Sequence, residues 1–271
     1  MSKALAVSHG EFGRAALYDL DRPITTHAHR EGHLIFRVAG DCPNVRIRDH
    51  SVTCSDTIAA AVSPWEPHSF EIPSGSCFAL VLYIKPMWFL ENTGSSEFAL
   101  DFGTSLLHLT PDIQKLIHSL TSLMIRDDAE FGVEQLLIEL TSSCYALSWR
   151  NGRRKSAYGS ALRFSDFRIR RSQKLMTSYL SDHEGLDHLA SEVGLSRPHF
   201  FKLFKKQTGV TPNIYFNTLR SERAIEDLST TDKSVTEIAH DLGFASQASF
   251  TRFFTYNVGI APTEYKRVAH Q

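Results

Sequence analysis

The sequence has few cysteines, little net charge and no long apolar run. Its four cysteines, at positions 42, 54, 77 and 144, form no CxxC pair, which argues against a thiolate zinc site. The longest strongly apolar run, FALVLYI at 78–84, is far too short to span a bilayer and is expected to be a buried strand. The first residues, MSKALAVSHGEFGR, lack the apolar segment of a secretory signal. We therefore expect a cytoplasmic protein with reduced thiols and no membrane partner.

The near-zero net charge hides an asymmetry along the chain. Residues 1–149 hold 10 Lys and Arg against 18 Asp and Glu, whereas residues 150–271 hold 19 against 12. The length of 271 residues favours two domains. The basic C-terminal part suits a polyanion, and the acidic N-terminal part would stay away from phosphates.

The spacing of apolar residues predicts an α+β chain with two domains. Residues 1–105 contain short apolar or alternating runs separated by turn residues, which indicates a β-sandwich or a small barrel. From Pro111 the apolar residues recur at helical spacing and predict two amphipathic helices. We expect an N-terminal domain over 1–149, a Gly- and Ser-containing linker over 150–165, and an all-helical domain over 166–271.

One supersecondary unit occurs twice in the C-terminal part. The segment GLSRPHFFKLFKKQTGVTPNIY (194–215) matches GFASQASFTRFFTYNVGIAPTEY (243–265), with most equivalent residues fifty positions apart. The first copy predicts a helix around 186–193, a turn at 194–196 and a second helix over about 197–208. Ser196 suits the N-cap, where its hydroxyl can accept a free amide, and Gly209 suits the helix end. Each copy therefore has the helix-turn-helix pattern.

The second helix of each copy has an apolar face and an opposite polar face. The cation at the outward position recurs as Lys202 and Arg252, which can contact guanine or a phosphate. Gln247 can pair with adenine, and Phe201 can contact a thymine methyl group. The residues expected to face DNA are Arg197, Pro198, Phe201, Lys202, Lys205, Gln247, Ala248, Thr251 and Arg252.

The segment between the copies, residues 212–230, predicts one long helix. At about 1.5 Å per residue it would be about 27 Å long. Successive major grooves on one side of B-DNA lie about 34 Å apart. Such a helix can therefore hold two recognition helices in adjacent grooves.

The C-terminal part resembles the AraC/XylS family of transcription regulators. The resemblance rests on LASEVGLSRPHFFKLFKKQTGVTP, LRSERAIEDL and VTEIAHDLGFASQASFTRFFTYNVGIAPTEYKR, and covers about residues 166–268. It implies an all-helical domain with two DNA-binding motifs. One departure is that Pro198 and Phe201 offer no side-chain donors. The second motif would then anchor the complex, or the first would recognise T-rich DNA.

Histidines gather in the segment THAHREGH of the N-terminal part. His27, His29 and His33 have the same strand parity and would face one side of a strand, and His68 follows in PWEPHSF. This arrangement resembles a cupin barrel, although the cupin pattern has Glu where His33 stands. Candidate effector-pocket residues are His27, His29, His33, Phe36, Trp65, His68, Phe70 and Tyr83, and the candidate metal ligands are the four histidines His27, His29, His33 and His68.

Three interpretations of the histidines stay open: a divalent metal site, a pocket for a small organic effector, and a structural role. The resemblance as a whole implies an effector-responsive activator, not an enzyme, that binds promoter DNA, recruits RNA polymerase and forms a homodimer. The alternatives are a metal-dependent cupin enzyme fused to a DNA-binding domain and an architectural DNA-binding protein without a sensor.

Overall fold

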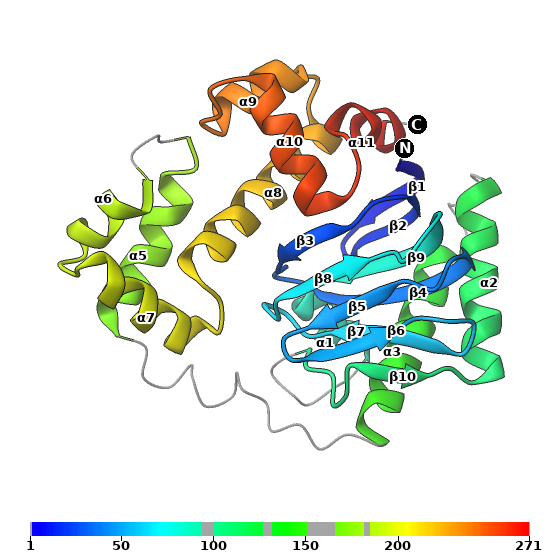
Figure 1. The fold of residues 1–271 in the computed structure, drawn as a ribbon. Coiled ribbons are helices and arrows are strands. Elements are labelled where there is room, and N and C mark those ends of the chain that lie inside the picture. The colour runs from blue at the N-terminus through cyan, green and yellow to red at the C-terminus, as the bar shows by residue number, and fades with distance from the viewer. Residues whose placement is uncertain (1, 94–99, 127–131, 151–165, 182–184, 271) are drawn as a thin grey trace.

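The N-terminal part of the computed structural model consists of two antiparallel sheets covered by helices (Figure 1). The structure describes residues 2–93, 100–126, 132–150, 166–181 and 185–270. The larger sheet has the order β1 (Lys3–Gly10), β2 (Gly13–Leu20), β9 (Cys77–Ile84), β4 (Gly32–Gly40), β7 (Ile58–Val62) and β10 (Leu106–His108). The smaller sheet has the order β3 (Ile24–His27), β8 (His68–Glu71), β5 (Asn44–Ile47) and β6 (His50–Thr53).

The larger sheet is buried on both faces, because it lies between the smaller sheet and a layer of helices. On β9, Val81 and Tyr83 face the smaller sheet, whereas Leu80 and Leu82 belong to a separate core. That second core is completed by α1 (Pro86–Thr93), α2 (Pro111–Arg126) and α3 (Val133–Arg150). Alternate residues of β9 thus enter two different apolar layers, which explains its continuous apolar run. The predicted buried strand and the two amphipathic helices are confirmed.

The predicted β-rich N-terminal domain is present, but its strands form two sheets and not a closed barrel. The edges β6 and β10 end their sheets without pairing to each other, within the part of the chain that the structure describes. The predicted linker falls outside the described residues, except for Arg150, which ends α3.

The C-terminal part is entirely helical over its described residues. Its helices are α5 (Phe167–Ser178), α6 (Gly185–Glu192), α7 (Arg197–Thr208), α8 (Pro212–Thr230), α9 (Val235–Asp241), α10 (Gln247–Val258) and α11 (Pro262–Ala269). The predicted long helix is α8, with the predicted bounds. In Figure 1, α8 runs between a group formed by α5, α6 and α7 and a group formed by α9, α10 and α11.

The group of α9, α10 and α11 packs directly on the sheets of the N-terminal part. Phe254 and Val258 of α10 share one apolar core with Leu20 of β2 and with the residues between the two sheets. In Figure 1, α11 lies beside β1. Burying these side chains against each other is favourable and joins the two parts across a wide contact. No helix in the described ranges is both long and apolar enough to cross a bilayer.

Candidate DNA-binding surface and effector site

Both copies of the repeat form a helix, a glycine turn and a second helix, as α6–α7 and α9–α10. The turn glycines Gly194 and Gly243 have φ of 71° and 74°. The second helices end at Gly209 and Gly259, with φ of 80° and 89°. These are left-handed conformations, which glycine adopts without a steric penalty from Cβ. The helix-turn-helix pattern and its helix ends are confirmed.

The two copies differ at the start of the second helix. Ser246 caps α10, because its hydroxyl accepts a hydrogen bond from the Ser249 amide at 3.2 Å. Ser196 holds the same position before α7, but its hydroxyl caps no amide. An N-cap side chain usually accepts from the N–H of the second or third helical residue. Pro198 is the second residue of α7 and has no N–H, so one of these two donors is missing. The prediction was right about the N-cap position of Ser196 and wrong about its hydrogen bond.

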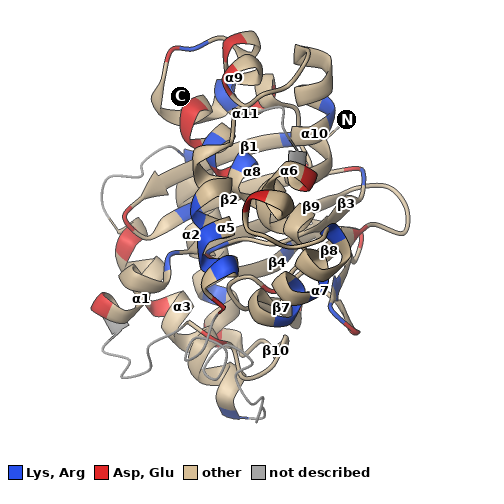
Figure 2. Cartoon of the chain, turned by 90° about the vertical axis from the view of Figure 1, so that its left-hand side faces the viewer, with Lys and Arg blue, Asp and Glu red and all other residues tan. Residues whose placement is uncertain are grey.

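The predicted DNA-facing residues lie on the outer faces of α7 and α10. Phe200, Phe204, Phe250 and Phe254 of the same helices are fully buried, which fixes the orientation of the opposite faces. Phe201 and Thr251 are half-buried, and the others are exposed: Arg197, Pro198, Lys202, Lys205, Gln247, Ala248 and Arg252. Lys and Arg also recur on the neighbouring α5 (Figure 2). The helical part therefore presents a basic surface, which suits phosphates.

Three cations of this surface are available for a ligand. No carboxylate in the described ranges pairs with Lys202, Lys205 or Arg252. Arg197 differs, because it forms an ion pair with Asp187 at 2.9 Å and lies over the ring of Phe201 at 5.3 Å from the centroid. The first motif thus offers two free lysines and a half-buried aromatic ring.

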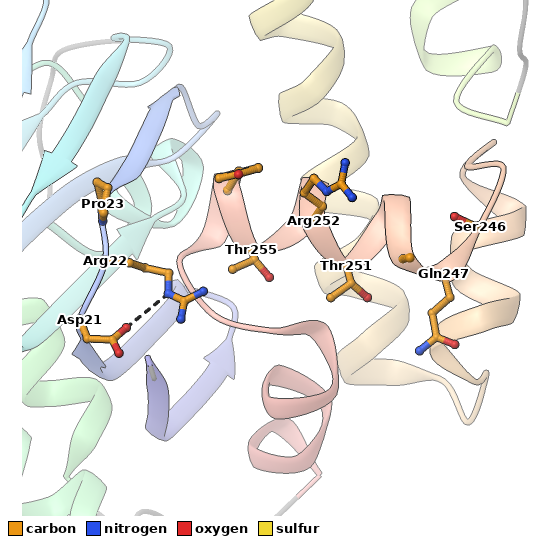
Figure 3. A pocket seen from close by; sticks show the side chains of 10 residues that line it. Asp21, Arg22, Pro23, Ser246, Gln247, Thr251, Arg252 and Thr255 are labelled. Carbon is orange, nitrogen blue, oxygen red and sulfur yellow. Dashed lines mark hydrogen bonds and ion pairs between the residues drawn. The ribbon is translucent and has the colours of Figure 1, made fainter.

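A groove of about 940 Å³ runs beside the outer face of α10. Its other wall is the β2–β3 connection of the N-terminal part, with Asp21, Arg22 and Pro23. Figure 3 shows Arg252 and Thr251 of α10 on one side, and Arg22 held by Asp21 at 3.3 Å on the other. The face of the second recognition helix is therefore flanked by the N-terminal part.

The four histidines of the N-terminal part come together, but His27, His29 and His33 do not share one strand as predicted: His27 ends β3, His29 follows it, and His33 lies on β4 of the other sheet. His27 and His68 are direct partners in the β3–β8 pairing, with ring centroids 4.4 Å apart. The rings of His29 and His33 lie 5.2 Å apart, and His33 stacks on Tyr83 at 4.4 Å. We call His27, His29, His33 and His68 the histidine cluster.

Hydrogen bonds fix the orientation of several of these rings. The Nδ1 of His27 lies 2.7 Å from the carbonyl oxygen of Thr25, and the Nδ1 of His68 lies 2.9 Å from that of Glu66. Because a carbonyl only accepts, both Nδ1 atoms carry the proton and both Nε2 atoms keep a lone pair. The Nδ1 of His33 lies 3.1 Å from the Nε2 of His68 and donates to it.

Burial keeps the histidine cluster neutral. Desolvation lowers the pKa of His27 to about 4 and that of His68 to about 3. It also lowers the pKa of His29 and of His33 well below the usual value. At neutral pH the cluster is a set of uncharged imidazoles, in which the Nε2 lone pair of His68 accepts from His33.

Comparison with known proteins identifies the C-terminal part. A helix-turn-helix domain model matches residues 189–268. The protein named "Probable transcriptional regulator LumQ" from Photobacterium leiognathi is 27% identical over 91% of this chain and 94% of its own length. The Tn10 TetD protein from Escherichia coli is 42% identical over 82 residues, which are 30% of this chain and 59% of that protein. Residues 189–268 of this chain are an AraC-type helix-turn-helix domain, and the chain is a DNA-binding transcription regulator.

The fold of the whole regulator matches solved structures of ToxT from Vibrio cholerae. An apo ToxT variant has a TM-score of 0.60 at 17% identity, covering 96% of this chain and 98% of ToxT. Wild-type ToxT bound to an unsaturated fatty acid gives the same TM-score and identity, covering 96% of this chain and 97% of ToxT. The two-domain fold, with a sheet-rich N-terminal part and a helical C-terminal part, is therefore a known arrangement.

A cavity of about 700 Å³ lies between the two parts of the regulator. The N-terminal part lines it with His29, Arg14 and Lys85, and α8 lines it with Glu222 and Glu226. The histidine cluster thus reaches the cavity through His29. The cavity was not predicted, because the sequence does not show that α8 packs against these strands.

Arg14 is a buried residue of this cavity that the sequence analysis missed. It is 6% exposed, its guanidinium lies 3.7 Å from the Tyr83 ring centroid, and its Nε has no hydrogen-bond partner. No carboxylate pairs with it in the described part of the chain. A signal was present, since Arg14 has the strand parity of Ala16, Tyr18 and Leu20, which all face the inner core.

Three of the predicted pocket residues lie elsewhere. Phe36 points into the core under α2 and α3, because it stands three positions from His33 on β4 and so faces the opposite side. Trp65 stacks on Tyr215 of α8 at 4.5 Å between centroids. Phe70 is packed between the two sheets. None of these three residues lines the interdomain cavity, and Tyr83 contacts His29 and His33 of the histidine cluster.

Proposed function

We propose that this regulator binds promoter DNA with α7 and α10 and that a small anionic effector in the interdomain cavity controls this binding. The observation that carries the proposal is the contact between α10 and the N-terminal part. Phe254 is fully buried in a core shared with both sheets, and the Thr25 hydroxyl donates to the Tyr256 carbonyl at 3.0 Å. A ligand between the two parts would therefore shift the second recognition helix.

The exposed side chains support a division of roles between the two motifs. Arg252 and Gln247 on α10 can donate hydrogen bonds to base edges. Pro198 and Phe201 on α7 cannot, whereas Lys202 and Lys205 can contact phosphates. The second motif would supply most of the base recognition, and the first would supply phosphate contacts and apolar contact with thymine.

The charges in the cavity favour an anion. Arg30 forms an ion pair with Glu222 at 2.9 Å, and Glu226 lies 3.6 Å from Arg223. Of the other charged groups that line the cavity, Arg14 and Lys85 are positive and Glu31 is negative. A buried guanidinium without a counter-ion is costly, and an anionic ligand would remove that cost. The unsaturated fatty acid bound to ToxT is a ligand of this chemical class.

A selection experiment followed by a ligand titration tests the proposal. The full-length protein should enrich a bipartite sequence from random duplex DNA, with the two parts about one helical turn apart. Enrichment of no sequence would overturn base-specific recognition and favour an architectural role. An unsaturated fatty acid should then change the affinity for the selected site, and its methyl ester should not. Equal effects of acid and ester would exclude recognition of the charge.

Further features of the regulator remain proposals. Its relatives are named as regulators of transcription, which supports a regulatory and not a catalytic role. We infer that DNA-bound protein activates transcription by recruiting RNA polymerase, and that α2 or α3 forms a homodimer interface. Ile125 of α2 is 59% exposed and lies at the end of that helix. Sedimentation over a range of protein concentrations tests dimerisation, and a constant monomer mass would exclude it.

A further inference from the structure

We propose that His27, His29 and His68 bind one divalent first-row transition metal ion at the junction of the two parts. One nitrogen from each of the three rings lies within 4.8 Å of the other two. His27 and His68 are held by strand pairing, and His29 follows β3 by two residues. Three imidazole nitrogens converging on one point are a typical ligand set for Zn²⁺ and Co²⁺.

The hydrogen bonds of the rings already match metal coordination. His27 and His68 each donate Nδ1–H to a backbone carbonyl, at 2.7 and 2.9 Å, which leaves Nε2 to bind a metal. Metal-bound histidines are usually oriented by such an outer hydrogen bond. The Nε2 of His29 is buried and has no hydrogen-bond partner. A metal ion would give that nitrogen a partner. Without one, its burial costs free energy, because the nitrogen loses its hydrogen bonds to water.

A metal ion on His68 would replace a hydrogen bond that His68 accepts from His33. In the structure His33 donates to the Nε2 of His68, and its own Nε2 is buried without a partner. Metal binding exchanges this hydrogen bond for a coordinate bond. It also draws the three nitrogens together to about 3.3 Å, as bonds of about 2.0 Å in a tetrahedron require. The fourth position is then filled by His33 or by a water molecule from the cavity.

Charges of both signs surround the cluster. Arg14 lines the same cavity as His29, and its positive charge opposes a cation in the cluster. Glu31 also lines that cavity and supplies negative charge, whereas Glu222 is paired with Arg30. The three imidazoles are neutral, so no proton has to leave before a metal binds.

The position of the site would link metal binding to the DNA-binding helices. The Ala28 carbonyl, between two of the ligands, accepts a hydrogen bond from Thr218 of α8 at 2.9 Å. Arg30, next to His29, pairs with Glu222 of α8. Fixing residues 27–29 on a metal therefore fixes the strand end that holds α8. This coupling rests on the proposed function, whereas the metal site itself does not.

Metal retention by untagged full-length protein tests the site. After chelation, incubation with Zn²⁺ and removal of excess ion, wild-type protein should retain one Zn²⁺ per chain. His29→Gln and His68→Gln should lose it, and His118→Gln, which changes an exposed histidine on α2, should retain it. No retention by wild type, or equal retention by all variants, would overturn the proposal.

A second measurement does not depend on folding of the variants. Co²⁺ added to wild-type protein should give the intense visible absorption of a tetrahedral nitrogen site, and Zn²⁺ should abolish it. Absence of the band would overturn the proposal. DNA affinity of the metal-free and Zn²⁺-loaded forms then tests the coupling. Sequence-specific binding by the metal-free form supports the proposed function in every case, and equal affinity of the two forms overturns only the coupling.

Discussion

The Arg14 guanidinium donates a hydrogen bond to the Tyr265 hydroxyl at 3.2 Å, although the two residues lie near opposite ends of the chain. The same hydroxyl lies 3.0 Å from the Nε2 of His9 and forms a hydrogen bond with it. Tyr215, at the equivalent position of the first repeat, stacks on Trp65. The repeated tyrosine therefore connects each helix-turn-helix unit to the N-terminal part, by a hydrogen bond in one copy and by ring stacking in the other.

Tyr265→Phe should weaken the junction without emptying the core. The ring stays, but Arg14 and His9 lose their shared partner, and an unsatisfied buried group costs about 1–3 kcal/mol. We expect the free energy of unfolding, measured in urea, to fall by that amount. Tyr256→Phe, at a residue 54% exposed, is the matched control and should change little. An unchanged stability of Tyr265→Phe would show that the hydrogen bond does not hold the junction.

Arg252→Ala should weaken binding to the selected DNA site by about 1–3 kcal/mol, because a bidentate contact with guanine is lost. The loss should be concentrated on sequences that carry the contacted base, and fluorescence anisotropy with matched and mutated duplexes measures it. Arg267→Ala removes the same charge at an exposed position of α11, away from the recognition face, and serves as control. Equal losses in both variants would indicate a general charge effect.

Lys205→Ala should behave differently from Arg252→Ala. Loss of one phosphate contact weakens binding to all sequences and lowers the slope of log affinity against log salt by about 1. A salt series with selected and random duplexes measures both quantities. A loss confined to the selected sequence would assign Lys205 to base recognition instead.

Metal-free regulator should lose stability as the pH falls below about 6.5. The folded-state pKa is lowered to about 4 at His27 and to about 3 at His68, and is also lowered at His29 and His33, so the unfolded chain binds more protons in this range. Each buried histidine contributes up to about 1.4 kcal/mol per pH unit between the two pKa values.

One carboxyl group acts in the opposite direction. Burial raises the pKa of Glu222 to about 7, so the folded chain binds more protons than the unfolded chain between about pH 4.5 and 7. The contribution of Glu222 to the free energy of unfolding is therefore lost as the pH rises through this range. Four histidines outweigh it, and urea unfolding with chelator at pH 7.5 and 5.5 should show the lower stability at pH 5.5. His29→Gln should reduce the difference, and His118→Gln should not. Equal stability of wild type at the two pH values would contradict the burial of the cluster.

Cys42 should be the cysteine that reacts with a maleimide in the native protein. Its thiol is exposed, whereas Cys54, Cys77 and Cys144 are buried. Burial raises the pKa of Cys54 and of Cys77 to about 12, which suppresses the reactive thiolate. Intact-mass measurement should show one adduct under native conditions and four after unfolding. Labelling of a second cysteine in the native state would show that a core opens.

Local signals in the sequence were sufficient for the helical part. The glycines and the periodic phenylalanines act within one or two turns of helix, and they predicted α7 and α8 with their observed bounds. The fifty-residue repeat predicted that the helix seen as α10 exists. Strand parity predicted His27, His29 and His33 on one side of a single strand, whereas they meet from β3, the following connection and β4 of the other sheet. The same parity rule would have put Phe36 on the opposite side of its strand from His33, because the two residues are three positions apart.

The sequence by itself determined two helix-turn-helix units, a β-rich N-terminal part and a gathering of histidines, because each depends on residues close in the chain. Only the tertiary structure decided that the strands form two sheets, that the second unit packs on them, and that Arg14 faces Tyr83 and Tyr265 beside an interdomain cavity. These features depend on contacts between segments up to 256 residues apart, where many apolar surfaces can pair with similar free energy. Shape and the burial of particular polar groups then select one arrangement among them.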